Sequence, residues 1–231
     1  MLSENNTGKY LKYAVGEIML VVIGILIALS INNWNEVRKD RIEEQKVLKT
    51  LKSNFESNKT QLRNNINETE ELVSDCDKNL ELFKLTQSEL NLLSKDSIRI
   101  RFRGYATFNP SDGALTSLLQ SGHLNIIVND SLKNKLTNWP NLVNDAKEDE
   151  NLLVEKITKD LLKQLIKYQS YIKNPKFKLN RLAIFDDFIL QNTIVFVRGG
   201  GNYQIYLYKE LESEIDQILN LIDEEISSDK N

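Results

Sequence analysis

One apolar segment, residues 14–31, constrains the fold of this chain more than any other feature. Its sequence, AVGEIMLVVIGILIALSI, has eighteen residues, and only Glu17 and Ser30 among them are strongly polar. At about 1.5 Å per residue, a helix of this length extends roughly 27 Å, close to the ~30 Å hydrocarbon core of a bilayer. We therefore expect a single-pass membrane protein with its transmembrane helix at 14–31.

Aromatic residues flank this segment on both sides. Tyr10 and Tyr13 precede it and Trp34 follows it, and such amphipathic rings favour the two interfaces between membrane and water. We interpret these three residues as membrane-interface anchors. A cleaved secretory signal is the competing interpretation, because the small residues at 28–30 resemble a cleavage site after an apolar run. Glu17, inside that run, argues against cleavage.

The charges around the segment leave its orientation open. Lys9 and Lys12 lie before it, whereas five basic residues follow between 38 and 49. A literal count of positive residues places the C-terminal part in the cytoplasm. A short basic N-terminus before a first hydrophobic segment is instead typical of a signal anchor, and long domains cross the membrane largely regardless of charge. We favour the second interpretation, with the soluble region outside the cytoplasm.

The N-terminal part of the chain also resembles a known family. Residues 8–18, GKYLKYAVGEI, followed by VVIGILIAL and by INNWNE at 31–36, are similar to the start of uncharacterised bacterial membrane proteins grouped as domain of unknown function 6090. A weaker similarity continues through SLLQSGHLNIIVNDSLKNKL and WPNLVNDAKEDE. The resemblance implies one membrane helix and a helical soluble region, and it brings no activity, substrate or cofactor. With the signal-anchor orientation, it indicates a bacterial inner membrane protein with a periplasmic soluble region.

A long amphipathic helix is expected after the apolar segment, because the chain has no Gly or Pro between Gly24 and Gly104. Apolar or small residues recur there at steps of three and four. They are Leu48, Leu51, Phe55, Leu62, Thr69, Leu72, Cys76, Phe83, Leu90 and Leu93. Asn58, Asn65 and Asn79 interrupt this seam, so we expect it to pack against helices of the same chain, with an intermolecular coiled coil as the alternative.

The middle of the chain changes pattern and then returns to helices. Residues 97–108 change period: apolar residues at 98, 100 and 102 alternate with three arginines, which predicts a short strand with one apolar face. An anion-binding role for the arginines is the alternative. Residues 109–113 predict a turn that begins a short helix, and Gly122 can terminate that helix. Asn129 or Asp130 can cap the next helix, which we expect to reach about residue 172.

The last third is expected to be helical with one break. Residues 182–197 are apolar enough to suggest a second membrane span, but they are too short and too polar for one. Three consecutive glycines at 199–201 predict a turn between two helices. The whole chain thus predicts a mainly α fold with at most one short strand pair. We divide it into a short basic tail (1–13), the transmembrane helix (14–31), a long helical stalk (32–96) and a helical head domain (97–231).

The residue types offer little support for catalysis or metal binding. His123 is the one histidine and Cys76 the one cysteine, so a His-based zinc site or a paired-histidine mechanism has no ligands. Asp145, Glu148 and Asp149 share a helix face, which we interpret as a solvated acidic surface. The net charge of −3, with both signs mixed, lacks the basic stripe that attracts nucleic acid. We expect no enzymatic activity, no cofactor and no nucleic-acid partner.

Glu17 is the candidate functional residue, because ionisable groups inside a membrane are energetically expensive. At 100° per residue it shares one side of the helix with Val21, Gly24 and Ala28, and small residues four apart allow helix backbones to approach closely. This stripe is the candidate contact with a partner helix or a site of ion coupling. The simpler interpretation, which we favour, is that the Glu17 carboxylate extends to the head groups.

We therefore interpret the chain as a membrane-anchored helical scaffold or interaction protein. Its expected partners are the lipid bilayer and either a second copy or another membrane protein. One alternative is an accessory subunit of an ion-driven transporter or motor that uses Glu17. Another is an envelope protein that senses a ligand between its helices.

Overall fold

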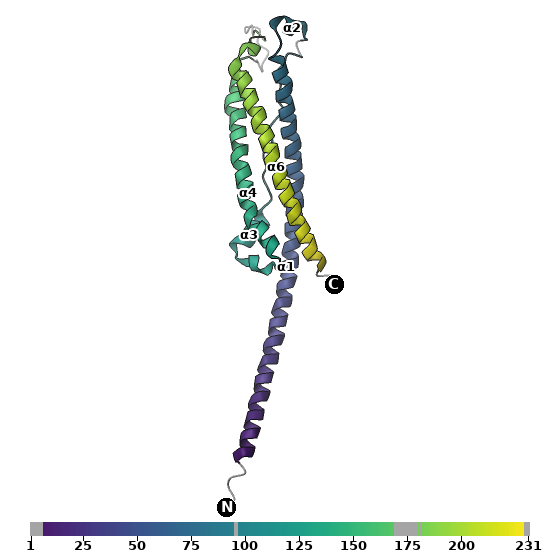
Figure 1. Ribbon diagram of the computed structural model, residues 1–231, viewed down its shortest axis with the longest axis vertical. Coiled ribbons are helices and arrows are strands. Elements are labelled where there is room, and N and C mark those ends of the chain that lie inside the picture. The colour runs from purple at the N-terminus through teal and green to yellow at the C-terminus, as the bar shows by residue number, and fades with distance from the viewer. Residues whose placement is uncertain (1–6, 95–96, 169–179, 181, 229–231) are drawn as a thin grey trace, which may run out of the picture.

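The computed structural model describes residues 7–94, 97–168, 180 and 182–228, and within these ranges it is helical with no strand, as the mainly α prediction requires (Figure 1). Three long helices dominate: α1 (Thr7–Leu82), α4 (Asp130–Glu155) and α6 (Phe188–Ser228). The shorter elements are α2 (Gln87–Leu92), α3 (Gly113–Gln120), the 3-10 helix η1 (His123–Ile126), the π-helical η2 (Lys156–Leu161), α5 (Leu162–Leu165) and the 3-10 helix η3 (Ala183–Asp186).

The second half of α1 packs lengthwise with α4 and α6 into a bundle (Figure 1). α1 and α4 run in the same direction, because residues 99–112 return the chain to the end of the bundle where α3 lies, and α6 runs antiparallel to both. We call that end the base. α1 has 76 residues, or about 114 Å of helix, and its first half projects from the base without another helix beside it.

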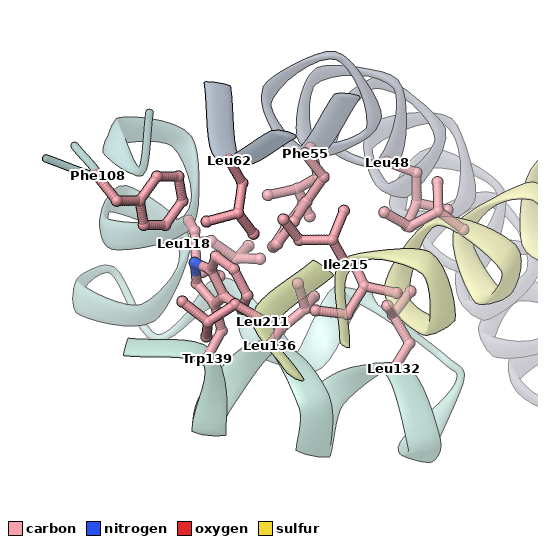
Figure 2. Close-up of a cluster of buried hydrophobic side chains, with 14 of the residues drawn as sticks. Leu48, Phe55, Leu62, Phe108, Leu118, Leu132, Leu136, Trp139, Leu211 and Ile215 are labelled. Carbon is pink, nitrogen blue, oxygen red and sulfur yellow. The ribbon is translucent and has the colours of Figure 1, made fainter. Parts of the chain in front are cut away.

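The bundle has two hydrophobic clusters stacked along its length. The lower one, nearer the base, centres on Phe55 and Trp139, whose rings meet edge to face with centroids 5.3 Å apart (Figure 2). Seam residues of α1 fill both clusters, so the predicted packing against helices of the same chain is confirmed. The single helix expected to carry this seam to Leu93 ends earlier, at Leu82, and Leu93 is exposed. Residues 48–82, which belong to the stalk in our division, share these clusters with α4 and α6.

The predicted strand at 97–108 is wrong. Residues 99–112, the return segment, have no regular secondary structure and form no strand. The alternation was informative about burial, since Ile100 is buried while Arg99 and Arg101 are exposed. The alternation could not show which groups form hydrogen bonds with the backbone N–H and C=O groups of this segment. In this fold, polar side chains form them.

Polar residues in the α1 seam supply those hydrogen bonds. Asn79 donates its Nδ2 to the carbonyl oxygen of Arg101 (2.8 Å). Asn58 accepts from the N–H of Ser111 (2.7 Å) and donates to its carbonyl oxygen (3.3 Å). Buried backbone groups need such partners. Two of the three asparagines that weaken a coiled coil, Asn58 and Asn79, therefore hold the return segment in place.

A buried carboxylate continues this pattern on α4. Glu150 accepts hydrogen bonds from the N–H of Phe108 (2.8 Å) and from the hydroxyl of Tyr208 (2.6 Å). Burial raises the pKa of Tyr208, and the hydrogen bond and charge of Glu150 raise it further. Tyr208 therefore stays a proton donor to Glu150 at any physiological pH, and this contact joins α6, α4 and the return segment.

The glycines at 199–201 lie inside α6, so the predicted turn is wrong. A Cβ atom on Gly200 would lie 3.2 Å from Cδ1 of Leu153, and one on Gly201 would lie 2.8 Å from Cγ2 of Val73. The missing side chains allow α6 to approach α4 and α1 closely. Close packing thus offsets the helix propensity that glycine lacks, about 1 kcal/mol per residue.

Other local predictions are confirmed. Gly122 ends the turn after α3 with a left-handed φ of 72°, which favours glycine. The side chain of Asn129 caps α4 by accepting the N–H of Leu132 (3.0 Å). Pro140, which the sequence suggests as a kink or a new helix start, lies inside the single helix α4, so a restart there is wrong. The predicted end of that helix near residue 172 falls outside the described residues.

Candidate functional site at the base of the bundle

The first part of α1 has no protein partner in the described chain. Every residue from 10 to 34 is exposed to solvent. Among the described residues α1 is the one helix long and apolar enough to cross a membrane, and its most apolar window has a mean hydropathy of 2.6. The segment singled out from the sequence is therefore a continuous helix with its apolar surface uncovered.

The stripe of candidate site residues lies on this projecting helix. Glu17, Val21, Gly24 and Ala28 follow one another at helical spacing, and all four are exposed. No neighbouring atom lies within 4 Å of a Cβ built on Gly24. The stripe thus lies on one helix face with no other described part of the chain against it, and its contact or ion-coupling role stays a prediction.

The aromatic anchors are equally exposed. Tyr10, Tyr13 and Trp34 keep 73%, 77% and 67% of their surface open, so none of them packs into the bundle. The guanidinium of Arg38 lies 5.8 Å from the centre of the Trp34 ring, within the range of a cation–π contact. An aromatic ring beside a cation is a combination suited to the head-group region.

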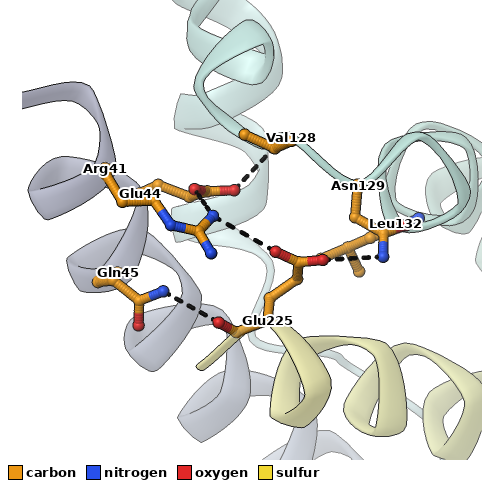
Figure 3. Close-up of polar contacts among 7 residues, drawn as sticks. All are labelled: Arg41, Glu44, Gln45, Val128, Asn129, Leu132 and Glu225. Carbon is orange, nitrogen blue, oxygen red and sulfur yellow. Dashed lines mark hydrogen bonds and ion pairs between the residues drawn. The ribbon is translucent and has the colours of Figure 1, made fainter. Parts of the chain in front are cut away.

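A polar cluster closes the base where α1 enters the bundle (Figure 3). Glu44 is fully buried, and its carboxylate forms an ion pair with Arg41 one turn earlier on α1. Its other oxygen accepts the N–H of Val128 (2.8 Å), in the segment before α4. A buried carboxylate is stable only when its charge and lone pairs are satisfied, and these two contacts do that.

Glu225, in the last turns of α6, joins the same cluster from the other side. Its carboxylate lies 3.4 Å from Arg41 and accepts from Nδ2 of Asn129 (3.1 Å). Its backbone carbonyl accepts from Nε2 of Gln45 (3.2 Å). Asn129 also caps α4, so one network holds α1, the start of α4 and the end of α6. We call these five residues, Arg41, Glu44, Gln45, Asn129 and Glu225, the base cluster.

The electrostatics of the base cluster favour the charged form of Arg41. Burial alone would lower the pKa of Arg41, but the hydrogen bonds and charges of Glu44 and Glu225 outweigh it and raise the pKa above its ordinary value. Arg41 therefore remains a cation at any pH at which the protein is folded. The arrangement fixes three helices relative to one another, because each of its carboxylates contacts groups from another segment.

A shallow groove of about 650 Å³ lies beside the base cluster, between α1, α3 and η1. Both acidic and basic groups line it, with Asp40, Glu43 and Lys46 on α1 and the exposed His123 on η1. No three His, Cys, Asp or Glu residues in the described part of the chain come close enough to hold a metal ion. The lining has no single sign of charge and no converging ligands, so it carries no chemistry that we can assign.

Sequence reasoning missed the base cluster, although one signal was present. Glu44 lies four residues before Leu48, at the seam position where the alternating spacing expects an apolar residue. Arg41 lies three residues before it, the spacing at which helical ion pairs form. An acid in a seam with a base one turn away indicates a buried pair. Glu225, about 180 positions later, had no such local signal.

A family model described as a family of unknown function (DUF6090) matches residues 17–197. The matched range includes most of the apolar segment, the Arg41–Glu44 pair, α4 and the start of α6, but it ends before Glu225. No curated protein and no solved structure matches the chain.

Proposed function

Because the chain belongs to the DUF6090 family of unknown function, we propose a role from its own architecture, that of a single-pass membrane protein whose rigid helical bundle is a scaffold for protein interactions. The observation that supports this role is the continuity of α1. One helix contains both the apolar segment and a full side of the bundle core. The bundle is therefore held at a set height and angle to whatever surrounds residues 14–31.

The short distance along α1 between the apolar segment and the bundle makes the connection between them stiff. Ten residues separate Ile31, the end of the apolar segment, from Arg41, and at 1.5 Å per residue they correspond to about 15 Å of helix. No glycine or proline lies between them to form a hinge. A bundle joined by so short a helix cannot turn independently of the membrane helix, which suits a scaffold that presents a surface in a fixed direction.

The base cluster supports the same role. A helix that projects from a bundle bends most easily at the point where it leaves the bundle, because side-chain packing stops there. Arg41 and Glu44 tie that point of α1 to Val128 and to Glu225 of α6. Tilting or rotation of the membrane helix would accordingly be passed to α6, and the bundle would respond as one body.

We place the protein in the bacterial inner membrane with the bundle in the periplasm. The short basic N-terminus before the apolar segment supports this orientation. A compartment-sensitive reporter fused after Asn231 tests it: activity of a periplasmic reporter is expected, and activity of a cytoplasmic one would reverse the assignment.

Two measurements on the full-length protein test the scaffold role. Alkaline carbonate washing and intact mass should find the whole chain in the membrane fraction, and release or loss of about thirty residues would contradict anchoring. Purification in a mild detergent should then recover either a self-oligomer or another protein at a constant ratio. A protein that stays in the membrane but is recovered as a monomer without a partner would overturn the interaction role.

A further inference from the structure

The outer face of α6 changes character halfway along the helix. From residue 188 to 206 every exposed residue is uncharged: Phe188, Ile189, Asn192, Val195, Phe196, Gly199, Asn202, Tyr203 and Tyr206. We call this the aromatic face. Arg198 is the one charged residue in the stretch, and it pairs with Asp77 of α1 (3.2 Å). Beyond it, the same side of α6 carries Glu210, Gln217 and Glu224, all exposed, as an ordinary solvated helix does.

The aromatic face has the spacing of a helix-packing surface. Ile189, Phe196 and Tyr203 are seven residues apart, and so are Asn192, Gly199 and Tyr206. These two interleaved sets have the relation of the a and d positions of a heptad. The opposite side of α6 already packs into the bundle core. α6 thus has two apolar faces, and one of them faces outward.

The exposed apolar area of this face is also larger than that of a typical monomer surface. Phe188, Phe196, Tyr203 and Tyr206 are 69%, 68%, 52% and 56% exposed. Together with Ile189 and Val195 they present on the order of 700 Å² of mainly apolar area, since each aromatic side chain offers about 150–250 Å². Monomers rarely expose apolar patches beyond a few hundred Å². A standard interface buries about 800 Å² on each partner, so this face has the area that a stable dimer needs.

The membrane that accommodates residues 14–31 cannot cover the aromatic face. Gly201 packs on Val73 of α1, which lies 42 residues beyond Ile31 and so about 60 Å further along the helix. Figure 1 shows this half of α6 at the end of the bundle opposite the projecting helix. The cover must therefore be protein.

We propose that residues 188–206 of α6 form the interface of a parallel homodimer, with two copies side by side in one membrane. The parallel alignment rests on the proposed membrane anchoring, because anchored copies all point the same way and carry this face at the same height. A two-fold axis then places α6 against α6 in register, each residue opposite its own copy, as an isologous interface requires. Confinement to one membrane also raises the effective concentration of the second copy.

The residues of the face fit this occupant. The exposed α6 residues of this face carry no charge, and Lys156 of η2, whose Nζ lies 5.7 Å from the centre of the Phe196 ring, is paired with Asp160 (2.6 Å). A continuation of the contact would bring Glu210 against its own copy, so the interface ends at Tyr206. No neighbouring atom lies within 4 Å of a Cβ built on Gly199. That open position gives an aromatic ring of the second copy a place to insert, as a knob enters a hole.

Cysteine cross-linking of the full-length protein in membranes tests both contact and direction. Asn192→Cys and Tyr206→Cys lie near opposite ends of the face, and each should form a disulfide-linked dimer with itself only if the two helices are parallel and in register. Ser57→Cys, on the exposed side of α1, is the control that should not cross-link. The native Cys76 is fully buried and should contribute no background.

A charge variant measures the strength of the contact. Phe196→Glu combined with Tyr203→Glu should raise the dimer dissociation constant by about tenfold or more, while Gln217→Glu on the polar half of α6 should leave it unchanged. Unchanged helical circular dichroism shows that the bundle is intact. Protein in the soluble fraction would contradict the anchoring proposal. Protein in the membrane that neither cross-links at residue 192 nor dimerises would overturn the homodimer alone, and so would a cross-linked adduct with a different protein.

Discussion

Truncation of Glu44 at the base cluster is expected to destabilise the bundle far more than truncation of its neighbour Glu43. Glu44→Ala removes the charge partner of Arg41 and the acceptor of the Val128 N–H. An unpaired buried N–H costs about 1–3 kcal/mol. Breaking a buried ion pair costs about 3–5 kcal/mol, but Arg41 keeps Glu225 and is 28% exposed, so only part of that applies. We expect a loss of about 3 kcal/mol.

Thermal unfolding followed by circular dichroism in detergent measures this loss. For a protein of this size, 3 kcal/mol corresponds to a decrease in Tm of roughly 6–12 °C. Glu43 is 59% exposed on its side chain, and its bond to Lys46 is 3.4 Å long, so Glu43→Ala should cost less than about 1 kcal/mol. Glu44→Gln keeps an acceptor for Val128 and should fall between the two. Equal decreases in Tm for Glu43→Ala and Glu44→Ala would refute the assignment of Glu44 as the residue that ties α1 to the bundle.

Three further predictions concern single residues in the bundle. Burial alone would raise the pKa of Asp187, but hydrogen bonds, chiefly from backbone N–H groups at the start of α6, lower it. The stability that Asp187 contributes is therefore complete above the unfolded pKa of about 3.9 and is lost as the pH falls through the lower folded pKa. The decrease in Tm on acidification should accordingly be shallower in Asp187→Asn than in the unchanged protein. Burial raises the pKa of Cys76 to about 12, so alkylation at pH 8 should be slow in the folded protein and rapid in denaturant, and equal rates would contradict its position in the core. Gly201→Ala should lower the free energy of unfolding by about 1 kcal/mol or more, because its Cβ would lie 2.8 Å from the stiff side chain of Val73. In the separated monomer, Gly199→Ala, whose Cβ meets nothing within its own chain, should raise it by up to about 1 kcal/mol. Chemical denaturation of both variants in dissociating detergent compares the two signs.

Local patterns were enough to predict the helices and the apolar segment. The seam from Leu48 to Cys76 is set by spacing along one helix, and spacing can be read without knowing what lies opposite. The cap at Asn129 and the left-handed Gly122 depend on a few neighbouring residues and were likewise predictable. The candidate stripe through Glu17 and Gly24 lies on one helix face, as predicted, but a single chain cannot show what that face contacts.

Features that depend on distant partners could not be predicted in this way. The glycines at 199–201 favour a turn locally, yet close approach to Val73 and Leu153 keeps them helical. Alternation at 98–102 correctly marks one buried face, but only the fold supplies Asn79 as the partner of that backbone. Glu225 joins Arg41 across about 180 positions, and no short pattern in the sequence links them.

Burial of the α1 seam within the bundle determines which surfaces remain for self-association. Asn58 and Asn79 weaken the seam as a coiled coil, and the structure shows them bonded to Ser111 and Arg101 of the return segment. With its apolar residues from Leu48 to Leu80 buried in the bundle, and Asn58 and Asn79 bonded to the return segment, this part of α1 has no free apolar seam for a second copy. A contact between two copies of the bundle itself would therefore use another helix, and α6 carries an uncovered heptad face at the end of the bundle opposite the base; the exposed stripe on the projecting part of α1 is a separate candidate contact. The asparagines that favour packing of α1 within its own chain thus leave α6 as the helix of the bundle with an apolar face open to a second copy.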